Sequence, residues 1–185
     1  MSISSLREIV SRVMPHRKPQ APAIKATRID YSKIAQTAED KARTFQHGKG
    51  KNTARERLTQ LLDADSFVEI GQFAGGNPAD GFLGAAVVTG FGEIAGRQVA
   101  VYAQDFSIRG GTLGRAEGQK ICALLDKAMM MKIPVISMLD SGGARIQEGV
   151  VALGQYGRIF KKTCEASGLI PQISMILGPG AGGAV

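Results

Sequence analysis

The sequence predicts an α/β fold, in which strands and helices alternate along the chain. From Arg97 to the end, short runs rich in β-branched residues alternate with longer segments of helical periodicity. A glycine-rich loop follows each of the three strands in this region, and glycine supplies 24 of the 185 residues. This order is typical of a sheet with parallel crossovers, in which a helix connects each strand to the next.

The N-terminal part is predicted to be a basic helical extension, residues 1–47, in front of a domain at 48–185. An amphipathic pattern in residues 1–14 ends at a proline-containing linker, and residues 30–47 have the composition of a polar helix. The Gly-Lys-Gly-Lys segment at 48–51 is expected to be a hinge. It is not a phosphate-binding loop, because the Gly-x-x-x-x-Gly-Lys-Ser/Thr spacing is absent.

The elements that follow the hinge are predicted from hydrophobic period and turn residues. The predicted strands are 66–72, 85–94, 97–104, 135–139 and 172–177, with a hairpin turn at Ala95-Gly96. The predicted helices are 54–62, from Gly114 to about Met131, and from about Ile146 onward. Thr53 and Glu56 have the spacing of a capping box for the first of these helices. The Met129–Met131 run is interpreted as core filling rather than as a binding surface.

The segment Asp140–Gly149 is the centre of the prediction. It follows a buried strand and precedes residues at helical spacing, Ile146, Val150 and Leu153. We therefore expect a strand, a tight Gly-Gly turn and the start of a helix. The first N–H groups of a helix have no intrahelical acceptor and carry partial positive charge. The junction is thus a candidate site for an anion, or for an oxygen that becomes negative during a reaction.

Two glycine loops are expected to meet at one edge of the sheet. Neighbouring parallel strands place their carboxyl-terminal loops side by side, so Gly142-Gly143-Ala144 should lie next to Ala181-Gly182-Gly183. One N–H group from each loop would make an oxyanion hole with two donors. The alternative is that these glycines only permit tight turns and close packing of helix against strand.

The side chains around the loops argue against a serine nucleophile. The two histidines, His16 and His47, lie in the N-terminal part, so Ser141 is interpreted as a turn or helix-cap residue. Asp140 is expected to order its loop rather than to act as a base.

A site with backbone donors and no evident base suits chemistry whose base comes from the substrate or a cofactor. Enolate formation through loss or transfer of a carboxyl group is one such case. The glycine loops lack Gly-x-Gly-x-x-Gly spacing, which argues against a dinucleotide site. Arg145 and Glu148 are expected to form a local ion pair.

The net charge of +7 is concentrated near the N-terminus. Residues 1–60 carry 13 Lys and Arg against 5 Asp and Glu, whereas residues 61–185 carry 10 against 11. This asymmetry indicates either a solvated basic face or an anionic partner. The sequence contains no nucleic-acid-binding motif and only 5% aromatic residues, which argues against nucleic acid. A phosphorylated small molecule is the other anionic candidate.

The remaining composition limits the compartment and the cofactors. Cys122 and Cys164 are too few for a disulfide framework, and no Cys/His cluster has metal-ligand spacing, so we predict a reducing compartment and no metal. No apolar run reaches the roughly 18 residues needed to span a bilayer. A cytoplasmic location is expected. The mitochondrial matrix is the alternative, since the Ser- and Arg-containing opening resembles a transit peptide, although an ordinary surface helix has the same pattern.

Blocks of familiar sequence run in one order from about residue 48 to the end. They are Gly50-Lys51 with Thr53–Leu58, Ala79-Asp80-Gly81 with Val87–Gly90, Gln104-Asp105-Phe106 with Gly110, Gly111 and Gly114, Asp140–Gly149, Ser167-Gly168 with Pro171-Gln172-Ile173, and Gly178-Pro179 with Ala181-Gly182-Gly183. Together they resemble the carboxyltransferase (β) subunit of biotin-dependent acyl-CoA carboxylases. That family includes propionyl-CoA carboxylase β subunits, transcarboxylase and the α subunits of methylmalonyl-CoA decarboxylase.

This resemblance implies a crotonase-like (ClpP/crotonase) fold of repeated ββα units that binds a coenzyme A thioester. It implies transfer of a carboxyl group between biotin on a carrier and the α-carbon of a short acyl-CoA, of propionyl or acetyl type. The residues implied to hold the thioester enolate are Gly142, Gly143, Ala144, Gly182 and Gly183. Those implied to bind substrate are Gly110, Gly111, Gly114, Ser141 and Ala181.

The resemblance also implies partners. They are a biotin carboxylase or biotin carrier subunit and further copies of the chain in a homo-oligomer, with the basic N-terminal segment facing CoA phosphates. Family subunits are much longer and have a second crotonase-like half, so we expect this chain to be the N-terminal, acyl-CoA-binding part, incomplete at its C-terminus. Position 180 is Gly where many relatives have Cys, and the loop before Gly81 is short.

Two other functions stay open at this point. One is a crotonase-type acyl-CoA hydrolase, isomerase or decarboxylase that does not need biotin. The other is a truncated, non-catalytic subunit that binds CoA or assists assembly. We also expect the isolated chain to associate, because its last predicted strand is not followed by a covering helix.

Overall fold

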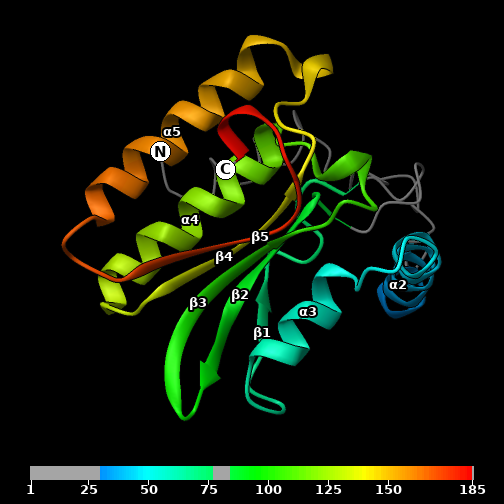
Figure 1. Cartoon of the computed structure of the whole chain (residues 1–185), viewed down its shortest axis with the longest axis horizontal. Coiled ribbons are helices and arrows are strands. Elements are labelled where there is room, and N and C mark those ends of the chain that lie inside the picture. Colours follow the sequence, from blue (N-terminus) through cyan, green and yellow to red (C-terminus); the bar gives the residue numbers. More distant parts are fainter. Residues whose placement is uncertain (1–29, 77–83, 185) are drawn as a thin grey trace, which may run out of the picture. The chain divides into compact units, whose positions relative to one another are not determined.

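The computed structural model describes residues 30–76 and 84–184. Their central element is a five-stranded sheet in the order β1-β2-β3-β4-β5 (Figure 1). The strands are β1 (Val68–Ile70), β2 (Val87–Ile94), β3 (Arg97–Gln104), β4 (Val135–Ser141) and β5 (Gln172–Gly180). The first three pair in antiparallel fashion, whereas β3, β4 and β5 are parallel. The predicted α/β class, with parallel strands in the C-terminal part, is confirmed.

Four α-helices accompany the sheet in the described part of the chain. They are α2 (Tyr31–His47), α3 (Ala54–Leu61), α4 (Arg115–Met131) and α5 (Val150–Ala166). In Figure 1, α4 and α5 cover one face of the sheet and α3 lies on the other. Neighbouring residues of β4 belong to different cores. Val135 belongs with Ile121 to the core of the α4–α5 face, and Ile136 belongs with Leu58 to the core of the α3 face. This alternation is the period of two expected of a strand that is buried on both faces.

The predicted hairpin is present, and an acidic side chain closes it. β2 and β3 pair along their full lengths, and Ala95 and Gly96 between them have φ of 50° and 71°. Positive φ at both positions gives a two-residue turn whose twist matches that of the strands. The Asp63 carboxylate accepts hydrogen bonds from the two turn N–H groups at 3.0 and 2.8 Å.

The predicted capping box at the start of α3 is also confirmed. Thr53 Oγ1 accepts a hydrogen bond from the N–H of Glu56, and Glu56 Oε2 accepts one from the N–H of Thr53 at 2.9 Å. The helix at 31–47 agrees with the polar helix expected there. Residues 1–29 lie outside the described part of the chain, so the extension at 1–47 and its boundary stay predictions.

The Gly-Gly turn does not open a helix, contrary to our expectation. After Gly143 the chain stays extended, and Ala144 forms a parallel bridge with Leu113. Leu113 donates its N–H to the Gly143 carbonyl and accepts from the N–H of Arg145, both at 2.9 Å, so it holds the backbone on either side of Ala144. A single 3₁₀ turn at Ile146–Glu148 follows, and α5 begins only at Val150.

The apolar residues that predicted a helix after the Gly-Gly turn are mostly exposed. Ile146, Val150 and Leu153 are 87%, 82% and 62% exposed. The buried face of α5 is carried instead by smaller and polar residues, Ala152, Gln155, Tyr156, Ile159 and Ala166. Val150 and Leu153 lie in α5 as their spacing predicted, on a part of the helix surface that the described chain does not cover.

The interpretation of the methionine run as core filling was wrong for two of its three residues. Met129 packs against the core of the α4–α5 face. Met130 and Met131 are 78% and 44% exposed at the end of α4. Three consecutive helical residues point in different directions, so one of them can reach the core without its neighbours doing so.

Candidate active-site loops

Three glycine loops meet where β3, β4 and β5 end. The N–H of Gly142 donates to the carbonyl of Gly110 at 2.9 Å, which joins the loop after β4 to the loop after β3. Ser141 is paired with Gly180 at the end of β5, which places the last glycine loop on the other side. The expected meeting of Gly142-Gly143-Ala144 with Ala181-Gly182-Gly183 is therefore present in the structure.

Two of these glycines are needed for the loops to approach so closely. A Cβ on Gly111 would overlap the carbonyl oxygen of Asp140. Gly143 has a φ of 95°, and a Cβ there would lie 3.0 Å from the carbonyl oxygen of Ala181. Both glycines therefore permit the close approach of the loops, and this role is compatible with a second role for their backbone.

Some backbone N–H groups of the glycine loops already donate within the protein, and only the others could donate to a bound oxygen. The N–H of Gly142 is taken by Gly110, and the N–H of Gly143 is taken by Ser141 Oγ at 3.1 Å. Among residues 30–76 and 84–184, no acceptor is found for the N–H of Ala144. In the last loop, the N–H groups of Gly182 and Gly183 have no acceptor in the described chain outside their own short 3₁₀ turn, Gly182–Ala184. Available donors therefore lie on both loops.

Gly183 is held against the aromatic residues of α5. A Cβ at this position would lie 2.8 Å from Tyr156 Cδ1 and 2.8 Å from Phe160 Cζ. The two rings pack on each other with centroids 6.0 Å apart. The last glycine loop thus rests on α5 through contacts that only a glycine permits.

Ser141 has the local role expected for it. Its side chain is fully buried, and its hydroxyl oxygen accepts the hydrogen bond from Gly143 within the turn. His47 is hydrogen-bonded to Glu56 at 2.8 Å, and His16 lies outside the described residues. No described histidine is paired with Ser141, so a Ser–His nucleophile receives no support.

Asp140 orders the central loop through a buried ion pair that the sequence did not reveal. Its carboxylate is fully buried and accepts from Arg57 Nη2 at 2.8 Å, with Lys51 Nζ at 3.5 Å. Its N–H donates to Gln104 Oε1 at 2.9 Å. Arg57 lies 83 residues away in the sequence, on α3, so no local pattern linked the two. The sequence signal that could have indicated burial of Arg57 is its position next to Leu58 on the short helix α3.

A second buried cluster fixes the start of α4. Arg145 donates to Glu117 at 2.6 Å and to Glu148 at 2.8 Å, which confirms the predicted pair with Glu148. Glu117 also accepts from the N–H groups of Ala86 and Gly114, both at 2.9 Å. Burial opposes ionisation of Glu117, but these hydrogen bonds outweigh it, and the pKa of Glu117 is lowered.

Gly114 has a structural part in this arrangement. Its N–H is taken by Glu117, and a Cβ on it would overlap the Glu148 carboxylate. The carbonyl oxygen of Gly110 accepts a hydrogen bond from the N–H of Gly142, and Gly110 has a left-handed φ of 65°. The contacts in the structure therefore use both glycines for loop geometry, and their role in substrate binding stays a prediction.

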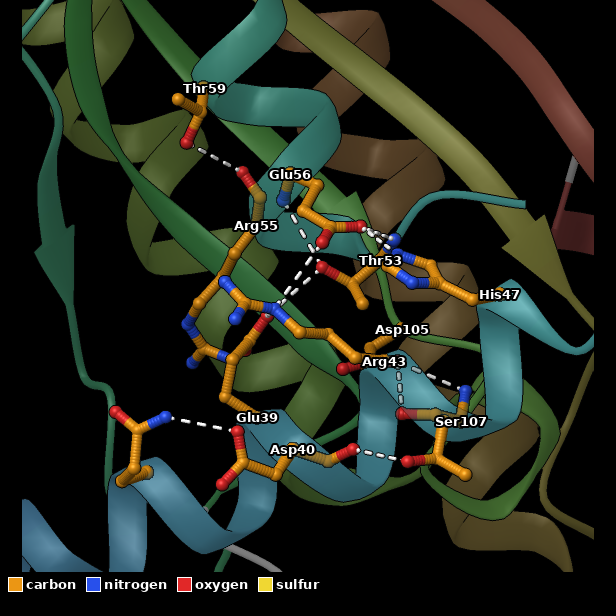
Figure 2. Close-up of polar contacts among 12 residues, drawn as sticks. Glu39, Asp40, Arg43, His47, Thr53, Arg55, Glu56, Thr59, Asp105 and Ser107 are labelled. Carbon is orange, nitrogen blue, oxygen red and sulfur yellow. Dashed lines mark hydrogen bonds and ion pairs between the residues drawn. The ribbon is translucent and has the colours of Figure 1, made fainter. Parts of the chain in front are cut away.

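Three basic side chains of α2 and α3, Arg43, His47 and Arg55, are paired with carboxylates (Figure 2). Arg55 donates to Glu69 at 2.9 and 3.1 Å and to Glu39 at 3.3 Å. Arg43 lies 3.3 Å from Glu56, which also accepts from His47. These residues attach the two helices to each other and to β1. Residues 1–29 lie outside the described part of the chain, so the role of the basic N-terminal segment toward CoA phosphates stays a prediction.

Lys49, which follows α2, contacts aromatic rings rather than a carboxylate. Its ammonium lies 3.9 Å from the ring centroid of Phe45 and 5.1 Å from that of Phe106. Such cation–π contacts hold the lysine close to the carboxyl end of β3.

In the described part of the chain, no group of His, Cys, Asp and Glu has the arrangement of a metal site. The two cysteines, Cys122 and Cys164, are free thiols.

Comparison with known proteins identifies the family. The model of the carboxyl transferase domain matches residues 45–185. The chain belongs to the carboxyl transferase domain family. The match includes all three glycine loops and α3 with its capping box.

Relatives of this carboxyl transferase domain are much longer. The chain is 53% identical over 152 residues to the propionyl-CoA carboxylase β chain of Saccharopolyspora erythraea, covering 79% of this chain and 28% of that protein. It is 53% identical over 148 residues to the mitochondrial propionyl-CoA carboxylase β chain of Homo sapiens, covering 76% and 28%. The chain thus spans less than a third of these relatives.

Two solved structures share the fold. The transcarboxylase 12S structure with hydrolysed methylmalonyl-coenzyme A bound has a TM-score of 0.74 at 41% identity, over 83% of this chain and 31% of that one. The β subunit of geranyl-CoA carboxylase from P. aeruginosa has a TM-score of 0.68 at 31% identity, over 78% and 28%. The predicted crotonase-like fold of the carboxyl transferase domain is confirmed. No helix among the described residues is long and apolar enough to cross a membrane.

Proposed function

We propose that this chain is the acyl-CoA-binding part of a carboxyltransferase. The complete enzyme would move a carboxyl group between biotin on a carrier and the α-carbon of a short acyl-CoA, of propionyl or acetyl type. Family membership and the names of the relatives support this proposal. The observation that carries it is the pair of adjoining glycine loops, each with N–H groups that have no acceptor in the described chain outside the loop.

In this proposal the two loops hold the thioester oxygen. The N–H of Ala144 on one side and those of Gly182 and Gly183 on the other donate to it as negative charge develops in the enolate. Each such donor is worth about 3 kcal/mol of transition-state stabilisation. Gly142 and Gly143 act indirectly, because their own N–H groups are used inside the loops that present Ala144.

No side chain near the loops is assigned as a base. Asp140 is held by Arg57, and Glu117 and Glu148 are held by Arg145. Deprotonation of the acyl α-carbon is therefore assigned to a group of the reacting partners. Biotin supplies the carboxyl group when its carrier is bound, and we assign its site to protein outside this chain. Gly110, Gly111, Gly114, Ser141 and Ala181 are proposed to line the substrate side through their backbone.

We further infer a biotin carrier or biotin carboxylase subunit and other copies of the chain as partners. The related transcarboxylase 12S forms a hexamer assembly, which supports an oligomer here. The location is proposed to be the cytoplasm, with the mitochondrial matrix as the alternative, since the mammalian relatives are named mitochondrial.

The first test is calorimetric titration of the folded chain with propionyl-CoA and with free CoA. Binding of both, weakening as salt rises, is expected if the CoA site lies within this chain. Absence of binding by folded chain would overturn that assignment and favour a truncated or assembly subunit. Turnover of an acyl-CoA without any biotin carrier would instead favour a biotin-independent crotonase-type enzyme.

A pair of glycine variants tests the loops. Gly143→Val places a branched side chain against Ala181 at a left-handed φ, so it should block the loop junction and abolish acyl-CoA binding and turnover. Gly154→Val is the matched control, because a Cβ at this helix position meets nothing within 4 Å. If both variants fold and both retain activity in the complete enzyme, the loops do not hold the thioester.

A further inference from the structure

Tyr156 of α5 lies against both of the glycine loops that carry available N–H donors. Its ring contacts the last loop, since a Cβ on Gly183 would lie 2.8 Å from Tyr156 Cδ1. Its hydroxyl lies beside Ser141, whose Oγ accepts the hydrogen bond from Gly143 in the loop after β4. Ala144 packs against the same hydrophobic core as Tyr156. The side chain therefore reaches from one loop to the other.

The position of Tyr156 is fixed by close packing. The residue is 6% exposed and belongs to the buried face of α5. The preceding residue, Gln155, lies so close to α4 that a Cβ on Gly118 would overlap its side chain. The ring of Phe160 packs on that of Tyr156, with centroids 6.0 Å apart. A ring packed in this way cannot move away from the loops unless α5 moves as well.

The hydroxyl of Tyr156 contributes its size rather than a hydrogen bond. It is buried, and it forms no hydrogen bond of ordinary geometry with residues 30–76 and 84–184. Burial raises the pKa of Tyr156, and the neighbouring Ser141 opposes this rise. Because the hydroxyl is buried, it cannot touch a substrate, so any influence of Tyr156 on the reaction passes through the loops.

We propose that Tyr156 is a positioning residue, a rigid spacer between the two glycine loops. Its ring sets the position of Gly183, and its hydroxyl end sets that of the turn at Ser141. The length of the side chain thereby fixes the separation of the N–H groups of Ala144 and Gly183. Two donors stabilise one oxygen only when both point at the place that it occupies. The inference rests on the function proposed for the loops, in which these donors share the thioester oxygen.

Tyr156→Phe shortens the spacer by one oxygen atom and keeps the ring. It removes a buried hydroxyl that has no partner, so the midpoint of thermal unfolding should stay within about 2 °C of the parent. Calorimetry with the full chain compares propionyl-CoA with free CoA, which has no thioester oxygen. Propionyl-CoA should bind about fivefold more weakly to the variant, as expected when one hydrogen bond between neutral groups is weakened. The affinity for free CoA should be unchanged.

Tyr102→Phe is the matched control, because it removes the hydroxyl of another tyrosine that packs against the same core. The Tyr102 hydroxyl lies beside Ser137, within β4, rather than beside a glycine loop. This variant should change neither affinity. Tyr156→Leu, which removes the ring as well as the hydroxyl, should weaken propionyl-CoA binding more than Tyr156→Phe does.

The amide signals of the loops test the spacer without any ligand. In ¹⁵N spectra of the full chain, the Ala144 and Gly183 signals should shift in Tyr156→Phe and stay in place in Tyr102→Phe. Unchanged signals in Tyr156→Phe would overturn the proposal, and so would equal weakening of both ligands, which would mean a general role in packing. A parent chain that binds propionyl-CoA no better than free CoA would contradict the function proposed for the loops, whereas shifted amide signals would still support the spacer.

Discussion

The α3 side of the sheet and the edge formed by β5 and α5 are built in opposite ways. On the α3 side, Leu58 is fully buried and Arg57 is paired with Asp140. At the β5–α5 edge, Leu153 and Ile176 are 62% and 59% exposed. The α3 side buries its leucine and pairs its arginine with an aspartate, whereas the β5–α5 edge presents apolar surface of the kind that marks contact with another protein. We therefore expect substitutions on the α3 side to change stability and substitutions at the β5–α5 edge to change association.

A pair of leucine variants measures this contrast most strongly. Leu58→Ala removes a fully buried side chain from the core of the α3 face and should lower the free energy of unfolding by about 2–5 kcal/mol. Leu153→Ala on α5 should change it by less than about 0.5 kcal/mol. Urea denaturation of both variants checks the pair. Similar losses would mean that α5 is as well packed as α3.

A pair of glutamate variants tests the buried charges. Burial opposes ionisation of Glu117, but bonds from Arg145 outweigh it and lower the pKa of Glu117, so this carboxylate stabilises the fold above its unfolded-state pKa. That contribution is lost as the pH falls through the lowered value. Glu117→Gln should cost about 1–3 kcal/mol at neutral pH and progressively less below about pH 4.

Glu165→Gln is the control for this prediction, because Glu165 is an exposed residue of α5. Urea midpoints measured across the acid range should show a pH-dependent difference from the parent for Glu117→Gln alone. A constant difference at every pH would mean that the ionised form of Glu117 is not what stabilises the start of α4.

A pair of threonine variants gives a smaller effect. Thr53→Ala removes the cap of α3 and the hydrogen bond to Glu39, and should cost about 0.5–2 kcal/mol. Thr163→Ala removes only a hydroxyl that bonds back to Ile159 within α5, so it should be neutral or slightly stabilising. Thermal denaturation compares the two. A larger loss at Thr163 would contradict the assignment of α3 as the internally fixed side.

Local patterns predicted the elements whose causes are local. The capping box depends on Thr53 and Glu56, three residues apart, and the hairpin depends on Ala95-Gly96 between its strands. The juxtaposition of the glycine loops also followed from local strands, once parallel pairing was assumed. In each case the residues that determine the structure are close in sequence or are joined by a general rule of topology.

The features that the sequence did not reveal depend on distant partners. The chain stays extended at Ala144 because Leu113, from another loop, bonds to the backbone on both sides of it. Asp140 is paired with Arg57, which no spacing indicates. The exposure of Ile146 and Val150 depends on where α5 lies over the sheet, whereas periodicity reports only that one helix face is apolar.

The last variant, Ile176→Lys, is expected to change self-association of the chain and to change its stability least. Ile176 is 59% exposed on β5, the edge strand of the five-stranded sheet, and we expect the purified chain to self-associate through the β5–α5 edge. Ile176→Lys should weaken this association about tenfold, because burying an isoleucine contributes about 1.5–3 kcal/mol, while the stability of the fold stays nearly constant. Sedimentation velocity over a range of concentrations measures the change.

Val68→Lys is the matched control for association, because Val68 is 63% exposed on β1 at the opposite edge of the sheet. It should leave association unchanged. A monomeric parent chain, or equal effects of the two lysines, would mean that exposed apolar area does not direct association. Dependence on Ile176 alone would show that the β5–α5 edge is completed by contact with another protein surface.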